Sequence, residues 1–494
     1  MRRLATALTT RGAVRSGALT GVAQVVLSLT AAGAGALLAQ HFGRSAETDG
    51  FLAAYAVYSL LVLAAQAFRM VVVPDLTRAR SAGQLAPETR AYALSFLLLA
   101  IPTCVVVVAF AHPLGDLVTG NLPPVSADVA GRALEILVPA AFVQLLAALA
   151  ASALAADDSY GTAALGLGVS GIFGLALFAA LAGPVGIVGL AWALLANALV
   201  AFAVPLVGLV RRGVVRAGRG DLGVLPRLWR LLQGAAVPIS LQACYLVGLR
   251  LAANLGIGSV TSFTYAYLAA STLVGATGFA LSLVTSAPLT RRGVDARAAG
   301  AHIEHAAWIS LSLVGAATGV FALVGGKIVH LALGEHYGGR VGRDLGLLVV
   351  YLAPWMIAWV GFVVTFPLVF VAQRRRLLVP VALLALVVMI PAGLALRSLW
   401  GLPGIAIAVG LATTAIALGL MAAIGRQTLV AGAVGLARVG LALGTAALVA
   451  FGGLALVLSP LAAAVVGVPL YALILFSMRS LGLGDAWAYV RHLN

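Results

Sequence analysis

The chain has 494 residues, of which 62% are apolar and 9% are charged, and its formal net charge is +16. Soluble domains carry roughly a quarter charged residues, so this composition excludes a soluble globular protein and indicates a membrane protein. Each spanning helix needs ~20 apolar residues, so the length allows well over ten spans and leaves no room for a sizeable soluble domain.

Long apolar runs predict fourteen spanning helices in chain order. The predicted spans are residues 17–40, 51–73, 91–112, 133–155, 160–183, 185–210, 232–255, 263–287, 304–326, 346–372, 377–396, 401–423, 436–457 and 460–478. Membrane barrels instead show short alternating segments of ~10 residues. The fold class is therefore all-α and polytopic, and an even number of spans places both termini on one side.

The basic residues predict which side that is, because Lys and Arg collect in cytoplasmic loops. With the termini inside, the inner segments carry 23 of the 31 Lys and Arg residues, the outer segments carry six, and Arg69 and Arg250 fall within spans. Both termini are therefore predicted in the cytoplasm. Arg outnumbers Lys 30 to 1 and Ala and Gly are abundant, which is typical of a GC-rich bacterial genome, so the predicted location is the plasma membrane of a bacterium. The positive-inside bias and attraction to anionic headgroups account for the net charge, and no basic face with stacking aromatics indicates nucleic-acid binding.

Two distant stretches share a pattern that indicates an internal repeat. Residues 42–78 and 255–291 align at an offset of 213, and each has a glycine turn, one span, and then a proline followed by Leu-Thr-Arg, in "PDLTR" and "APLTR". An offset of six spans predicts two parallel six-helix lobes related by a pseudo-twofold along the membrane normal. The expected domains are an N-lobe (1–210), a cytoplasmic linker (211–231), a C-lobe (232–425), and a last part with two helices and a tail (426–494).

Parallel lobes of this kind enclose a cavity that opens alternately to each side of the membrane in transporters. The stretches "FGRSAETDGFLAAYAVYSLL" with "VVVPDL", and the segment from "PISLQACYLVGLR" to "SAPLTRR", resemble the MurJ/MviN lipid II flippases of the multidrug/oligosaccharidyl-lipid/polysaccharide (MOP) exporter superfamily. The resemblance implies a flippase for a polyprenyl-pyrophosphate-linked saccharide such as lipid II. It also implies that membrane lipids and this saccharide are the partners.

The chain departs from the pattern of that family. Members place several arginines on helices one, two and eight, whereas this chain has Ser28 and Ala34 on helix one and Ala266, Tyr267 and Leu268 where helix eight would read Ala-Asp-Arg. Two alternatives therefore stay open: a cation-coupled multidrug antiporter of the same superfamily, and a non-transporting pseudo-flippase scaffold. The coupling ion and the saccharide also stay open.

The candidate substrate-binding residues are polar groups within predicted spans. They are Gln24, Asp49, Gln66, Arg69, Asn197, Gln242 and Arg250. A charge at the bilayer centre costs ~2.5–3.5 kcal/mol, and a phosphate group would offset that cost for the two arginines. Snorkelling of the arginines to the interface and hydrogen bonds between helices explain the same residues equally simply.

Enzymatic motifs are not apparent. The adjacent Asp157 and Asp158 lie in a short predicted loop, and the seven histidines show no metal-ligand spacing. Cys104 and Cys244 both fall within spans and predict neither a disulfide nor a metal site. We expect no cofactor, no catalytic residues and no ATP hydrolysis by this chain.

Overall fold

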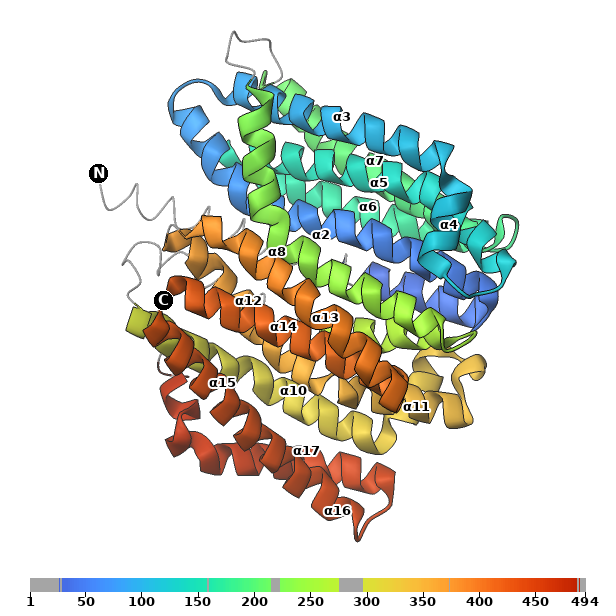
Figure 1. Cartoon of the computed structure of the whole chain (residues 1–494), viewed down its shortest axis with the longest axis vertical. Helices are drawn as coiled ribbons and strands as arrows, with labels where there is room; N and C mark the ends of the chain where they lie inside the picture. Colours follow the sequence, from blue (N-terminus) through green and yellow to red (C-terminus); the bar gives the residue numbers. More distant parts are fainter. Residues whose placement is uncertain are drawn as a thin grey trace. The chain divides into compact units, whose positions relative to one another are not determined.

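The computed structural model describes residues 26, 29–157, 160–214, 223–274, 296–372, 374–486 and 488. Every regular element in these ranges is helical. The chain divides into two compact units, Met1–Gln242 and Ala243–Asn494, which we call unit 1 and unit 2 (Figure 1). The protein is an all-helical polytopic membrane protein.

Unit 1 is organised around one long helix, α5 (Pro124–Ala156), which packs against all the other long helices named for this unit except α8. Those helices are α2 (Ala46–Ser81), α3 (Leu85–Ala109), α4 (Ala111–Thr119), α6 (Tyr160–Leu181), α7 (Gly189–Arg211) and the first part of α8 (Val224–Ala253). In α5, 72% of the most apolar window is buried, against 28% in α3. The helix is therefore the core of unit 1, while α3 leaves most of its apolar surface for lipid.

Helix α2 is longer than the membrane is thick. Its 36 residues span about 54 Å at 1.5 Å per residue, against ~30 Å of hydrocarbon. The prediction that the second span ends at residue 73 was wrong, because the "PDLTRAR" stretch continues the helix to Ser81. Its polar side chains project from helix rather than from a turn.

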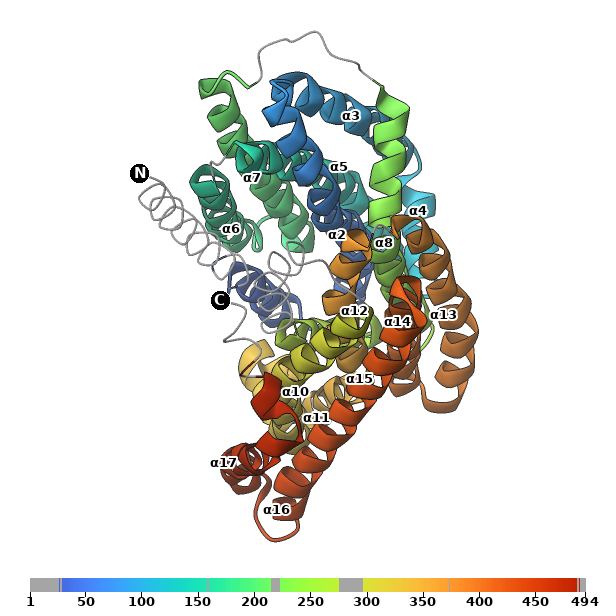
Figure 2. The same ribbon diagram turned by 90° about the vertical axis from the view of Figure 1, so that its left-hand side faces the viewer.

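Unit 2 holds the rest of α8, a helix over residues 259–274, and the remaining elements (Figure 2). These are α10 (Ala296–Leu333), α11 (Gly339–Tyr351), α12 (Ala353–Val371), α13 (Leu378–Trp400), α14 (Leu402–Ile424), α15 (Arg426–Ala447), a π-helical turn (Leu448–Gly452), α16 (Gly453–Ala455) and α17 (Pro460–Ser477). Helix α14 is the counterpart of α5: 61% of its apolar window is buried, and it contacts α11, α12, α13 and α15.

The tenth predicted span, 346–372, is two helices. α11 and α12 meet at Leu352 with a bend of 42°. Pro354 is the second residue of α12, and a proline lacks the N–H that a continuous helix would need. The break therefore follows from the local sequence, although the hydropathy profile runs through it.

Most other predicted spans correspond to one helix each. Among the described residues, nine helices are long and apolar enough to cross a membrane, and ten if α11 and α12 form one broken span. The second and fifth predicted spans correspond to α2 and α6. The first and eighth are described only in part, as helical residues 29–42 and 259–274. The prediction missed α4, and the last part of the predicted linker, from Val224, belongs to α8.

Candidate functional site

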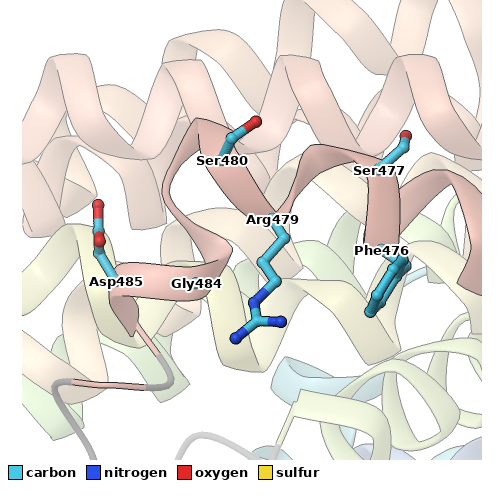
Figure 3. Close-up of a pocket in the computed structure, with 6 residues that line it drawn as sticks. All are labelled: Phe476, Ser477, Arg479, Ser480, Gly484 and Asp485. Atoms are coloured by element: carbon cyan, nitrogen blue, oxygen red, sulfur yellow. The ribbon is translucent and has the colours of Figure 1, made fainter.

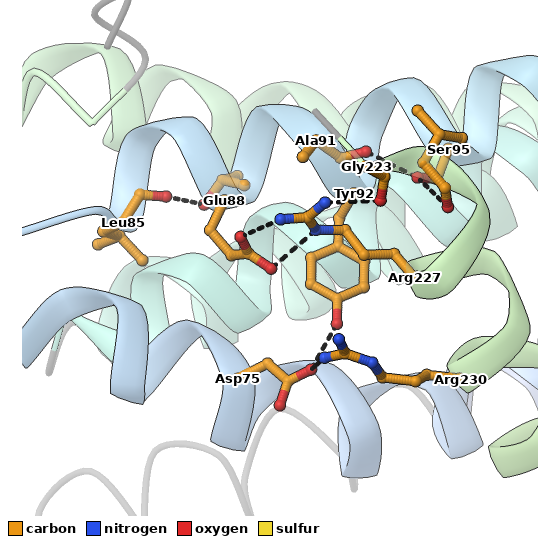
Figure 4. Close-up of polar contacts among 11 residues, drawn as sticks. Asp75, Leu85, Glu88, Ala91, Tyr92, Ser95, Gly223, Arg227 and Arg230 are labelled. Atoms are coloured by element: carbon orange, nitrogen blue, oxygen red, sulfur yellow. Dashed lines mark hydrogen bonds and ion pairs between the residues drawn. The ribbon is translucent and has the colours of Figure 1, made fainter. Parts of the chain in front are cut away.

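Asp75, in the "PDLTRAR" stretch of α2, is the centre of a polar network at the predicted inner end of unit 1 (Figure 4). Its carboxylate accepts a hydrogen bond of 2.6 Å from the Tyr92 hydroxyl of α3 and one of 3.2 Å from Arg230 Nη1 of α8. Arg78, one turn further along α2, pairs with the other carboxylate oxygen. One acidic residue therefore connects three helices.

A second ion pair lies beside it. Arg227 of α8 donates from Nε and Nη2 to the two carboxylate oxygens of Glu88 in α3, at 2.9 and 2.6 Å. The Arg227 side chain is 11% exposed and that of Glu88 is 21% exposed. Arg227 also donates to the carbonyl of Gly223 and lies 6.0 Å from the centre of the Tyr92 ring. Paired charge-assisted bonds of this kind fix orientation as well as distance, so the start of α8 is held on α3.

The same end of unit 1 carries a third charged group around Asp157, which follows α5. Arg80 of α2 lies 3.4 Å from the Asp157 carboxylate and donates to the carbonyl of Ala156, while Arg212 at the end of α7 pairs with Asp157 at 2.9 Å. The arginines at this end of unit 1 therefore hold helix ends together, in addition to their predicted effect on membrane orientation. Asp158 lies outside the described residues.

Asp49 and Asn197 are two predicted site residues of unit 1 whose side chains the structure describes. Asp49 is fully buried in the first turn of α2, which Ser45 caps by accepting from the Thr48 N–H. Asn197 of α7 donates to the Ser170 carbonyl of α6 at 2.9 Å. Both residues therefore have structural roles within unit 1, one at a helix start and one between helices.

The other predicted residues of unit 1 are less fully placed. Gln24 lies outside the described residues. Gln66 and Arg69 lie in α2, and only their backbone is described. Arg69 is 12 residues from the end of α2, about 18 Å along the helix.

Gln242 and Arg250 both belong to α8. Gln242 is 7% exposed. Arg250 lies in the last turn of the helix and is half-buried. Its Nη1 atom is buried without a hydrogen-bond partner in the part of the chain that the structure describes. A buried guanidinium N–H without a partner is costly, and this atom keeps a donor that no described residue uses.

Tyr267 stands where the resemblance would place an aspartate, with Leu268 in the place of the arginine, and it is part of an aromatic stack in unit 2. Its ring lies 4.3 Å from Tyr245 of α8 and 4.6 Å from Trp355 of α12. Trp359 and Phe362 continue the row along α12, each 5.2 Å from the ring before it. This part of unit 2 is therefore held by aromatic packing rather than by charge, and the cations for a phosphate must come from other positions.

A surface pocket lies at the end of α17, lined by Phe476, Ser477, Arg479, Ser480, Gly484 and Asp485. Figure 3 shows Arg479 projecting to one side and Ser480 and Asp485 to the other. The polar groups do not converge on a common point. We therefore do not assign a ligand to this pocket.

Sequence reasoning named none of Asp75, Glu88, Tyr92, Arg227 and Arg230 as site residues. Their pairs are separated by up to 155 residues in the chain, so no local spacing could reveal them. The available signal was acidity itself: Asp and Glu together number only 15 in 494 residues, and two of them lie at the predicted inner ends of adjacent spans.

The fold is similar to that of several solved multi-helix membrane transporters. A solved structure of lipid II flippase MurJ in an inward closed conformation matches with a TM-score of 0.71 and 16% identity, over 94% of this chain and 99% of that chain. A MOP superfamily transporter from Pyrococcus furiosus matches with a TM-score of 0.59 and 15% identity, over 87% of this chain and 96% of that one. The eukaryotic MATE transporter AtDTX14 matches with a TM-score of 0.57 and 15% identity, over 87% of this chain and 100% of that chain.

The sequence decides the family within that class. The family described as "Lipid II flippase MurJ" matches residues 38–477. The chain belongs to this family, which confirms the resemblance seen in the sequence. Among curated proteins, none matches.

Proposed function

We propose that the protein is a flippase that carries a polyprenyl-pyrophosphate-linked saccharide, lipid II or a related cell-envelope precursor, across the bacterial plasma membrane by alternating access. The observation that supports this most strongly is the family match over residues 38–477. The MurJ-like fold over 94% of the chain supports it as well.

Recognition of a pyrophosphate requires cations that are not already neutralised. Arg250 meets this requirement, because its Nη1 is buried without a hydrogen-bond partner among the described residues. A guanidinium group binds phosphate oxygens through two parallel N–H bonds, which an ammonium group cannot reproduce. We assign Arg250 to the headgroup, with Arg69, Gln66 and Gln242 as further candidates and Gln24, Asn197 and Asp49 as supporting polar groups.

The test is a flipping assay in proteoliposomes that contain fluorescent lipid II, with protection from a membrane-impermeant quencher as the readout. The wild type should move the lipid, and Arg250→Ala should lower the initial rate about tenfold or more, the equivalent of one charge-assisted contact. Arg250→Lys should recover only part of the rate, because the paired donors are lost. Arg397→Ala, which removes an arginine from the predicted outer end of α13, is the matched control and should leave the rate unchanged.

The outcomes separate the alternatives. A wild type that moves no lipid II but exports cationic dyes in exchange for ions would identify an antiporter. A wild type that moves neither lipid II, nor other polyprenyl-pyrophosphate-linked saccharides, nor dyes would identify a scaffold. Normal flipping by Arg250→Ala would keep the flippase function and remove Arg250 from the headgroup site.

A further inference from the structure

The predicted outer side of unit 2 carries a concentration of basic residues that topology does not explain. Outer segments hold only six Lys and Arg residues, yet Lys327, Arg340 and Arg343 lie together in one stretch of 17 residues at the end of α10 and the start of α11. His330 and His336 lie in the same stretch. The positive-inside bias works against this placement, so the local structure must account for it.

The two helices cross very closely at this point. Gly326 of α10 and Gly342 of α11 are in contact, and a Cβ on Gly342 would lie 2.9 Å from the Gly326 carbonyl oxygen. A Cβ on Gly346 would lie 2.9 Å from the backbone of Gly325. The register of these contacts, with Gly325 opposite Gly346 and Gly326 opposite Gly342, shows that the helices are antiparallel. Figure 1 shows α10 leading into α11 at this end of unit 2.

This crossing places Lys327 and Arg343 on the same side of the helix pair. Each residue follows its contact glycine by one position, which is a turn of about 100° in the same rotational sense. In antiparallel right-handed helices, equal rotations away from the contact lead to the same side. The two charges therefore start from touching backbones and project next to each other, with His330 and Arg340 one turn away on the same side.

The two cations are available for a ligand. Lys327 and Arg343 are both exposed, and neither forms an ion pair within the described ranges. Their neighbours are only weakly neutralised: Arg340 and Asp344 are 3.7 Å apart with side chains 92% and 63% exposed, and His330 lies 3.9 Å from a Glu335 that is 94% exposed. Exposed pairs of this kind contribute little, so a net positive surface remains.

An apolar side chain adjoins the same surface. Leu347, one turn after Arg343, is 38% exposed, and because α11 runs inward from the predicted outer side, it lies on the membrane side of the two cations. A pair of cations with an outward leucine on its membrane side matches an amphiphile that has an anionic head and an acyl chain. A soluble anion would use the cations and leave the leucine without a partner.

We propose that Lys327 and Arg343 bind the phosphodiester headgroup of an anionic phospholipid from the outer leaflet, with Leu347 against its acyl chain. Arg343 supplies paired donors to the phosphate oxygens, and Lys327 supplies a compact charge. This lipid is a bound component of the membrane and is distinct from the saccharide carrier of the proposed function. The inference depends on the predicted orientation of the chain but does not depend on the flipping activity.

The test is native mass spectrometry of the full chain, titrated with phosphatidylglycerol or phosphatidylcholine in detergent. The wild type should bind phosphatidylglycerol at least tenfold more tightly than phosphatidylcholine. The double variant Lys327→Gln/Arg343→Gln should lose most of that preference. The matched control is Arg132→Gln/Arg397→Gln, which removes two other predicted outer arginines and should keep the preference within about twofold. Thermal unfolding of both variants checks that they are folded.

Three results would overturn the proposal. The first is unchanged phosphatidylglycerol binding by the folded Lys327→Gln/Arg343→Gln variant. The second is displacement of the lipid by farnesyl pyrophosphate at a tenfold lower concentration than by phosphatidylglycerol, because the site would then belong to the carrier pyrophosphate. The third is failure of an impermeant maleimide to label Lys327→Cys in intact cells, because the site would then not face outward.

Discussion

Arg227 shows how much one residue can contribute at an inner helix end. Its side chain is only 11% exposed, and Glu88 neutralises its charge through two hydrogen bonds. Glu88→Gln removes that charge and leaves a cation that is largely withdrawn from water. Breaking an exposed ion pair costs less than breaking a buried one, and this pair lies between the two cases. We therefore expect Glu88→Gln to lower the free energy of unfolding by about 1–3 kcal/mol. Thermal unfolding in detergent should therefore show a midpoint lowered by several degrees.

The double variant Glu88→Gln/Arg227→Gln distinguishes the ion pair from general packing. With both charges removed, no unpaired cation remains, so the double variant should be more stable than Glu88→Gln alone. If the double variant loses as much stability as Glu88→Gln alone, or the sum of the two single losses, the two side chains contribute through packing and not through their charges. The residue scale is also where the sequence was least informative: the type and burial tendency of Glu88 are visible in it, but a partner 139 residues away is not.

At the scale of elements, close helix crossings decide how much a glycine contributes to stability. A glycine at a crossing cannot accept a methyl group, whereas a glycine in open space can. Gly346→Ala would place a methyl group 2.9 Å from the Gly325 backbone, so α10 and α11 must separate. We expect a loss of about 1–3 kcal/mol and weaker binding of phosphatidylglycerol at Lys327 and Arg343, both measured on the same preparation.

Gly168→Ala is the matched control for that prediction. A Cβ at this position of α6 has no atom within 4 Å, so the change should be neutral or stabilising by up to about 1 kcal/mol through helix propensity and unfolded-state entropy. A destabilised Gly168→Ala, or an unaffected Gly346→Ala, would contradict the argument. The sequence showed both glycines in spans, yet their spacing alone could not tell an open position from a crossing.

Element boundaries were predictable wherever hydropathy decides them. The fifth and fourteenth predicted spans, for example, match α6 and α17 to within two residues at either end. The differences occur where another force acts on the same residues. The Pro354 imide breaks a continuous apolar run into α11 and α12, and paired charges let α2 continue past residue 73 to Ser81 although the hydropathy falls. Hydropathy indicates how readily a segment enters lipid, and it detects neither a proline break nor an ion pair between helices.

At the scale of the whole molecule, the distribution of arginines predicts the orientation of the chain in the membrane. That orientation decides which leaflet each surface faces and therefore what it can bind. The network around Asp75 and the Arg227–Glu88 pair should face the cytoplasm, and the Lys327–Arg343 surface should face outward. Both assignments follow from 23 inner against six outer basic residues, because Lys and Arg resist translocation across the membrane. A reversed chain would place the phospholipid surface on the inner leaflet.

Two exposed serines test this orientation directly, in a background in which Cys104 and Cys244 are replaced by alanine. Ser81→Cys lies at the end of α2 and Ser398→Cys near the end of α13, and the two ends are predicted to lie on opposite sides. An impermeant maleimide should label Ser398→Cys in intact cells and should label Ser81→Cys only after the membrane is permeabilised. The opposite pattern would reverse every surface assignment at once, whereas labelling of both in intact cells would mean that the count of spans between α2 and α13 is wrong by one. Because the two cysteines are separated by an odd number of predicted crossings, the experiment tests the orientation and the span count with the same pair of variants.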